Sequence, residues 1–208
     1  MVRALKRCTE CRCTGGGLDL ATHPVDLLLD LVPVACHYIE MINAEFLLAI
    51  DLEATCDATQ LPIAEREIIE IGAVIIKTDG YLKMGEFQSF VRPVKTEKLT
   101  DYCRNLTSID QKDVDGAPLF PAVLTAFKEF LTPYSDLMFC AWGDYDYRQF
   151  TRDCATYEVD CPFEQQVDIS KSFRRFMKLD RRPSLRDAAR LMELDFQGTQ
   201  HRAIDDAR

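Results

Sequence analysis

Long apolar runs are missing from this 208-residue sequence. Its most apolar early stretch, residues 25–36, is interrupted by Asp26 and Asp30, and it is shorter than the roughly 20 residues that a transmembrane helix requires. The basic residues near the start are not followed by the apolar segment that a secretory signal contains. We therefore expect a cytoplasmic protein that has no membrane partner.

Positive charge is also scarce. The chain has 25 lysines and arginines against 34 aspartates and glutamates, which gives a net charge of −9. Such a balance argues against a protein that holds nucleic acid by charge alone, because lysine and arginine bind phosphate groups. A carboxylate cluster that binds cations would account for part of the excess acid. Residues 171–190 are the exception, with eight basic residues: Lys171, Arg174, Arg175, Lys178, Arg181, Arg182, Arg186 and Arg190.

The sequence contains nine cysteines. In a chain without a secretory signal we expect reduced thiols, most of them buried. Cys8, Cys11 and Cys13 could form half of a zinc site that a later cysteine or histidine completes. Incidental cysteines are favoured instead, because no second Cys-x-x-Cys pair follows. We expect residues 1–44 to be an N-terminal extension without a regular fold, and residues 45–208 to be the folded domain.

The apolar pattern changes at Phe46 and predicts strands and helices from there on. An apolar run at 46–50 leads directly into Asp51 and indicates a buried central strand. Because the later strands alternate with helices, we expect an α/β fold with a mixed β-sheet flanked by helices on both faces. Further strands are expected at 67–76, 87–91, 137–142 and 167–169, and helices at 120–131, from 145, around 173–177 and from 184.

Two carboxylates end the first expected strand. Asp51 and Glu53 flank Leu52, so they project from the same face of the strand. Carboxylates at the end of an apolar strand are unfavourable unless something pairs with them, and oxygen ligands suit Mg²⁺ or Mn²⁺. Taken alone, an Asp-x-Glu sequence is a weak signal, and a strand end that reaches solvent is the simpler explanation.

Two later segments offer further ligands. Asp144 and Asp146 lie between an expected strand and an expected helix, where aspartate ordinarily caps the helix; either one could instead bind a metal. His201 is followed by Asp205 and Asp206, and an imidazole that titrates near neutrality suits a general base. A surface histidine beside two helix-capping aspartates is the alternative for this segment on its own.

Taken in order, these segments resemble the DEDDh (DnaQ-like) 3′–5′ exonuclease superfamily. The resemblance is greatest to the branch of the histone-mRNA and siRNA 3′ exoribonucleases and the KapD-like bacterial exonucleases. It covers residues 45–208 and is carried most clearly by residues 50–56 (IDLEATC), 67–72 (EIIEIG) and 99–109 (LTDYCRNLTSI), the last resembling the loop before the first long helix. It implies an RNase H-like fold.

The resemblance also implies a role for each site residue. Asp51, Glu53, Asp146 and Asp206 would bind two Mg²⁺ ions, which Mn²⁺ can replace, and His201 would act as general base. The implied reaction is hydrolysis of the terminal phosphodiester at the 3′ end of single-stranded RNA or DNA. Its product is a nucleoside 5′-monophosphate, and the Ala-Thr-Cys form of the first motif favours RNA.

The family motifs choose between neighbouring residues. An aromatic residue precedes the family's middle aspartate, which favours Asp146 over Asp144. The last aspartate lies five residues after the histidine, which favours Asp206 over Asp205. The resemblance further implies that four residues face the terminal nucleotide: Ala54, Thr55, Leu106 and Thr107.

Two alternative functions stay open. The family's last helix continues past the position of Arg208, so we expect most of that helix to be missing here. This favours a catalytically weak, nuclease-like module that binds RNA or regulates, and loss of digestion with retained RNA binding would identify it. The second alternative is a DNA-directed exonuclease, which matched RNA and DNA oligomers would distinguish.

Overall fold

The computed structural model describes residues 44–196 and 198–208. The expected N-terminal extension and its candidate zinc ligands lie outside the described residues. Within the described part of the chain, no helix is long and apolar enough to cross a membrane. Three of the five cysteines in this part are buried, as the sequence predicts for most of them.

A five-stranded mixed sheet forms the centre of the fold, in the order β3-β2-β1-β4-β5. Its middle strand β1 (Phe46–Ala54) pairs antiparallel with β2 (Ile68–Lys77) and parallel with β4 (Leu137–Ala141). β3 (Leu82–Phe90) and β5 (Gln166–Asp168) form the two edges. A short 3-10 helix, η1 (Ile63–Glu65), lies between β1 and β2.

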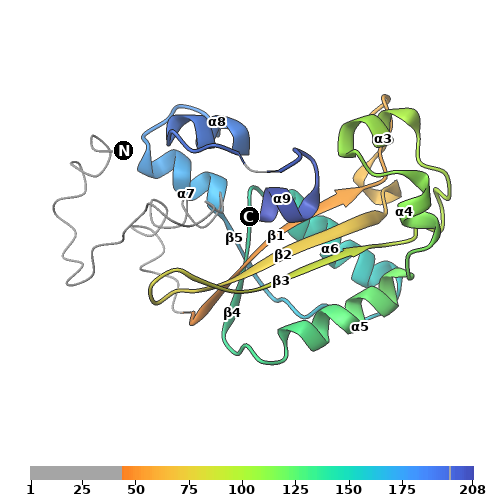
Figure 1. The fold of residues 1–208 in the computed structure, drawn as a ribbon, viewed down its shortest axis with the longest axis horizontal. Coiled ribbons are helices and arrows are strands. Elements are labelled where there is room, and N and C mark those ends of the chain that lie inside the picture. The colour runs from red at the N-terminus through yellow and green to blue at the C-terminus, as the bar shows by residue number, and fades with distance from the viewer. Residues whose placement is uncertain (1–43, 197) are drawn as a thin grey trace.

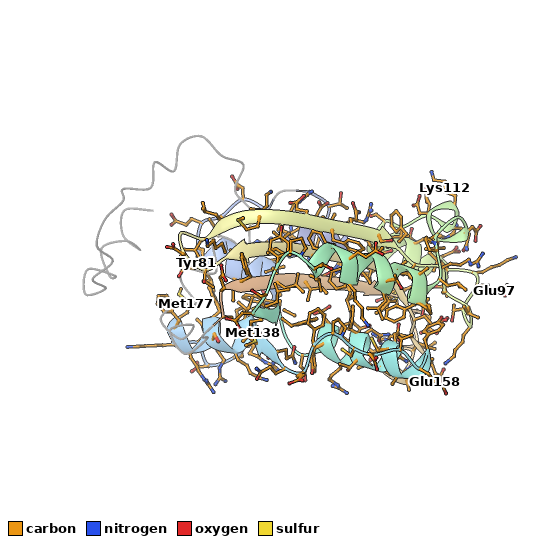
Figure 2. All side chains as sticks on the ribbon, turned by 90° about the horizontal axis from the view of Figure 1, so that it is seen from below. Tyr81, Glu97, Lys112, Met138, Glu158 and Met177 are labelled. Carbon is orange, nitrogen blue, oxygen red and sulfur yellow. The ribbon has the colours of Figure 1, made fainter. Side chains whose placement is uncertain are left out.

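Helices cover both faces of this sheet (Figure 1). α5 (Phe120–Leu131) and α6 (Tyr145–Thr156) pack on one face, and Figure 2 shows side chains filling the space between them and the sheet. On the opposite face lie α7 (Ile169–Phe176) and α9 (Ala203–Ala207), and α8 (Leu185–Leu191) packs against α7. The expected mixed sheet with helices on both faces is confirmed.

The side chains of β1 alternate between these two layers. Leu52 belongs to the core beside α5 and α6, whereas Leu47 and Ala49 belong to the core beside α7 and α9. Because alternate residues of a strand point to opposite faces, Asp51 and Glu53 point to the same face as Leu47 and Ala49. The two carboxylates of the first motif therefore face α9.

The third strand is longer than the sequence predicts. The sequence predicts a strand at 87–91, but β3 begins at Leu82, because its first residues pair with the end of β2. The turn between them contains Gly80 and Tyr81, both with positive φ. The early part of β3 contains lysine, glycine and glutamate, which have low strand propensity, so tertiary pairing rather than local sequence defines it.

The family resemblance predicts a loop at residues 99–109, but this segment contains a helix. α3 (Asp101–Thr107) is capped by Thr100, whose hydroxyl accepts a hydrogen bond from the backbone N–H of Cys103. α4 (Gln111–Asp115) follows immediately. Helices of this length give too little apolar periodicity to be recognised in a sequence.

Candidate active site

Residues from three segments meet where β1 approaches its carboxyl end. β1 supplies Asp51 and Glu53. Because β4 runs parallel to β1 and next to it, the residues that follow β4 arrive at the same edge of the sheet. There the carboxylate of Asp146, in the first turn of α6, accepts a hydrogen bond of 3.1 Å from the backbone N–H of Leu52. This hydrogen bond joins the middle segment to the residue between Asp51 and Glu53.

The structure separates the two candidate aspartates of this middle segment. Asp146 is 5% exposed and faces β1. Asp144 is exposed, occupies the position before α6, and lies 3.9 Å from Arg148 in a surface ion pair. Asp146 therefore has the position that a ligand next to Asp51 needs, whereas Asp144 does not.

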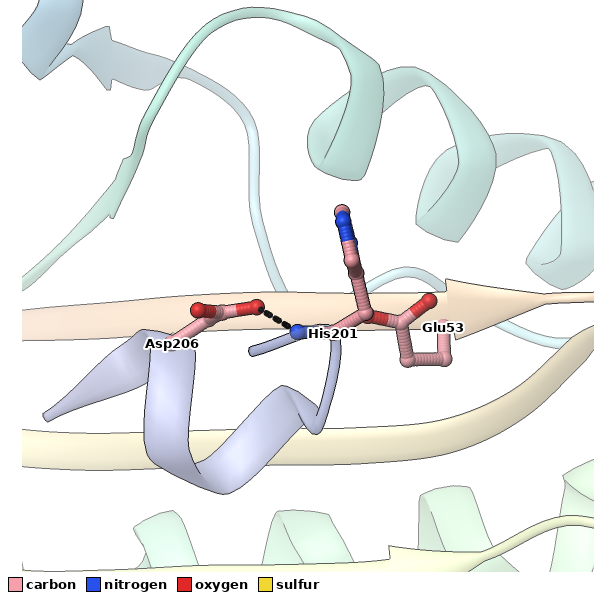
Figure 3. A group of neighbouring side chains, drawn as sticks. All are labelled: Glu53, His201 and Asp206. Atoms are coloured by element: carbon pink, nitrogen blue, oxygen red, sulfur yellow. Dashed lines mark hydrogen bonds between the residues drawn. The ribbon is translucent and has the colours of Figure 1, made fainter. Parts of the chain in front are cut away.

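The third segment completes the cluster (Figure 3). Glu53, His201 and Asp206 each have a potential ligand atom within 4.8 Å of those of the other two. The backbone N–H of His201 donates to Asp206 Oδ2 at 2.8 Å, and His201 has a left-handed backbone with φ of 61°. Asp205 is directed elsewhere, since its carboxylate accepts the N–H of Thr199.

A glycine on β2 allows α9 to come this close. Gly72 lies opposite Asp51 in the strand pairing. A Cβ atom on Gly72 would lie 2.1 Å from the carbonyl carbon of Ala203 and 2.2 Å from the backbone nitrogen of Ile204. The backbone of α9 thus rests directly on the sheet, and this contact places Asp206 beside β1.

The site concentrates negative charge. Burial raises the pKa of Glu53 to about 9, that of Asp146 to about 7 and that of Asp206 to about 6, and the neighbouring carboxylates add to the first of these shifts. Burial together with Asp146 and Glu53 raises the pKa of Asp51 well above its ordinary value. These carboxylates are therefore in an environment that disfavours their ionised form unless cations are bound.

The donor set fits divalent metal. Among the described residues, neither Asp51 nor Glu53 forms an ion pair with a basic side chain, and their excess charge is not neutralised by the protein. Carboxylate oxygens are the preferred ligands of Mg²⁺ and Mn²⁺. Asp51, Glu53, Asp146 and Asp206 could hold such ions, and His201 lies at the rim of the same cluster.

These shifts predict how stability depends on pH. Each acid binds its proton more tightly in the folded protein than in the unfolded chain, so the folded state loses stability as pH rises through the folded pKa values. Without divalent cations we expect the melting temperature to fall between about pH 4 and about pH 9. Bound Mg²⁺ or Mn²⁺ should raise it most at the alkaline end. Thermal melts with chelator and with metal test this. The same melting temperature with chelator as with metal at pH 9 would contradict it.

The residues expected to face a nucleotide differ in what they can offer. Leu106 is 36% exposed, whereas Ala54, Thr55 and Thr107 are buried. The hydroxyl of Thr55 accepts the N–H of Glu67 at 2.9 Å. The hydroxyl of Thr107 donates to the carbonyl of Cys103 at 2.9 Å. Of these side chains, that of Leu106 is the one open to solvent.

Sequence reasoning did not single out Glu70, Gly72 and Arg202, which hold α9 on the sheet. Glu70 is completely buried and forms a salt bridge with Arg202, the residue after His201. A signal for Glu70 was present: an acidic residue inside the apolar run 68–76 must find a partner. The contact of Gly72 depends on chain segments that are distant in sequence.

Known proteins resemble this chain in sequence. A profile of the Exonuclease family matches residues 48–208. The chain is 31% identical over 187 residues to 3′-5′ exonuclease Snipper of Drosophila melanogaster, covering 78% of this chain and 66% of Snipper. It is 32% identical over 142 residues to Probable 3′-5′ exonuclease KapD of Bacillus subtilis, covering 68% of each.

The fold also resembles a solved structure, the nuclease domain of 3′hExo, a DEDDh family member bound to rAMP. The TM-score is 0.71 at 27% identity, and the match covers 79% of this chain and 87% of the other. The chain spans 66%, 64% and 50% of the length of three of its curated relatives. The likeness therefore concerns only part of each of those longer proteins.

Proposed function

This chain belongs to the Exonuclease family, and from that premise we propose that it is a metal-dependent 3′–5′ exonuclease, with residues 45–208 as its nuclease domain. It hydrolyses the terminal phosphodiester of a nucleic acid and releases a nucleoside 5′-monophosphate. RNA is the preferred substrate, because the first motif has the form Ala54-Thr55-Cys56 and the solved relative holds rAMP.

One observation carries this proposal. Two segments that lie about 90 and 150 residues after β1 in the sequence meet its carboxyl end, and together they bring four carboxylates and a histidine to one place. Potential ligand atoms of Glu53, His201 and Asp206 lie within 4.8 Å of one another. Such a concentration of buried acid opposes folding in the metal-free protein. A catalytic metal centre explains why it is present.

The side chains divide the chemistry between them. Asp51, Glu53, Asp146 and Asp206 would hold two divalent cations, Mg²⁺ or Mn²⁺. When bound, the cations stabilise negative charge on the reacting phosphate and on the leaving oxygen. His201 acts as the general base. Burial lowers its pKa, so at neutral pH a ring nitrogen is free to accept the proton of the attacking water.

A timed digest of 5′-labelled single-stranded RNA, with Mg²⁺, with Mn²⁺ and with chelator, tests the proposal. We expect a ladder that shortens by one nucleotide at a time from the 3′ end, and only when metal is present. A matched DNA oligomer should be digested more slowly. Faster digestion of the DNA would favour the DNA-directed alternative.

If the folded protein leaves the RNA intact both with Mg²⁺ and with Mn²⁺, the catalytic proposal is wrong. Retained binding of the same RNA under these conditions would favour the alternative, a nuclease-like binding or regulatory module. Gel-shift measurements with the undigested oligomer distinguish these outcomes.

We also propose that the hairpin formed by α7 and α8 holds phosphates upstream of the cleaved bond. Lys171 and Arg182 pair with Asp168 at the end of β5, and Arg186 hydrogen bonds to Gln200, next to His201, at 3.4 Å. The hairpin is thus attached to the site. Four of its basic side chains have no partner among the described residues and are free to bind phosphate: Arg174, Arg175, Lys178 and Arg181.

Reversing one of these charges should weaken binding of long substrates selectively. For Lys178→Glu we expect a several-fold higher KM for a 20-nucleotide RNA and no change for a trinucleotide. The slope of log binding constant against log salt concentration should decrease by about the amount that one phosphate contact contributes. Lys112→Glu, an exposed charge reversal on α4, is the matched control. Equal effects of the two reversals would contradict this role.

A further inference from the structure

A fully buried carboxylate next to the cluster is not available to bind metal. Glu70 on β2 is 0% exposed. Its Oε1 accepts from Gln88 Nε2 at 2.6 Å and from Arg202 Nη2 at 3.1 Å. Its Oε2 accepts from Arg202 Nε and from the backbone N–H of Ala203, each at 3.1 Å. A carboxylate has about four lone-pair positions, and all of these are occupied.

These contacts connect the turn at His201 and Arg202, just before α9, to the sheet. Glu70 lies opposite Glu53 in the pairing of β1 with β2. Arg202 directly follows His201, and its guanidinium also lies over the ring of Phe90, 5.2 Å from its centre. A two-pronged contact of this kind fixes the orientation of the arginine as well as its distance. The residue next to His201 is therefore held rigidly at the level of Glu53.

Such a support matters because the turn at His201 is unfavourable by itself. Its backbone has a left-handed conformation, which is unfavourable for residues with a side chain. The turn lies at the start of the five-residue helix α9, which is too short to be stable by itself. The turn is closed by two local hydrogen bonds, from the His201 N–H to Asp206 and from the Arg202 N–H to the carbonyl of Thr199.

We propose that Glu70 and Arg202 are positioning residues that set the place of the His201 imidazole relative to Glu53. This inference rests on the proposed nuclease function, in which His201 is the base. The guanidinium of Arg202 contacts Glu70 and the ring of Phe90, and it acts on His201 through the backbone that joins the two residues. The packing of α9 on Gly72 holds the helix that carries Asp206 on the sheet, whereas the pair of Glu70 and Arg202 fixes the residue directly after His201.

Arg202→Lys tests this role, because it keeps the charge but loses the two-pronged contact. We expect kcat to fall about 10- to 100-fold, while KM and the affinity for Mn²⁺ change less than about twofold. In a His201→Ala background the same substitution should cost less than about threefold, since no imidazole is left to position. An equal loss in both backgrounds, or a parallel loss of Mn²⁺ affinity, would overturn the proposal.

Glu86→Gln is the matched control. Glu86 on β3 forms a similar two-pronged pair with Arg208, at 2.9 Å and 2.8 Å, at the other end of α9. It should leave kcat within about twofold of wild type. A loss as large as that of Arg202→Lys would mean that any attachment of α9 matters equally, and would overturn a specific role for Glu70 and Arg202.

Amide hydrogen exchange provides a readout that does not need activity. In Glu70→Gln, the peptide that contains His201 and Ala203 should exchange faster than in wild type, whereas in Glu86→Gln it should not. Unchanged exchange in Glu70→Gln would overturn the positioning role. An inactive wild-type protein that shows the expected exchange pattern would instead overturn the proposed function alone.

Discussion

Replacing Asp51 with asparagine is expected to abolish digestion and, at the same time, to raise the melting temperature of the metal-free protein. Burial and the neighbouring carboxylates raise the pKa of Asp51 well above its ordinary value, so its charge destabilises the folded state near neutral pH. Asparagine keeps the shape and removes the charge. Loss of this ligand should lower the rate by about 10³-fold or more, measured in the labelled-RNA digest.

Asp144→Asn makes the same chemical change at the exposed residue directly before α6. It should alter the rate by no more than about twofold and leave the melting temperature unchanged. If Asp51→Asn retained activity, or if Asp144→Asn lost it, the assignment of ligands would be wrong. If Asp51→Asn lost activity together with stability, the residue would have a structural role instead.

The sheet and its main helices follow from apolar patterning. The residues of the run 46–50 alternate between two buried layers, and β1 accordingly lies at the centre of the sheet. Where a residue's partner is distant, patterning is less informative. The first half of β3 is mostly exposed and has no alternating apolar pattern that faces a core, so it depends on pairing with β2. The helix α3 depends on a cap at Thr100 rather than on an apolar face. Family membership, inferred from ordered motifs, is confirmed.

The site could be predicted in part for the same reason. Short motifs identify Asp51, Glu53 and His201 as candidates because their chemistry is local. The motifs cannot identify what holds these side chains together. Glu70 and Arg202 are separated by 132 positions in sequence, and each alone looks like an ordinary charged residue. The supports of the site therefore become visible only when β2 and the segment before α9 are seen in contact.

Gly72→Ala is the second substitution with a large expected effect, although it adds only one methyl group. The new Cβ would lie 2.1 Å and 2.2 Å from backbone atoms of Ala203 and Ile204. Backbone atoms cannot rotate away as a side chain can, so α9 must move off the sheet. Asp206 and His201 then move away from β1, and misplacement by about 1 Å can cost about 10²-fold in rate. We expect a loss of at least that size in the digest.

Gly85→Ala separates this effect from a general intolerance of alanine in the sheet. Gly85 lies on β3, where a Cβ would meet side-chain atoms of Phe130 and Tyr134 at 3.2 Å, on the side of α5. Those side chains can yield, so activity should stay within about twofold of wild type. Gly72→Ala should cost about 1–3 kcal/mol of stability through overpacking, leaving a folded protein by circular dichroism. Near-wild-type activity in folded Gly72→Ala would mean that α9 need not rest on β2 for catalysis, and that the carboxylate of Asp206 is dispensable or is placed by other contacts.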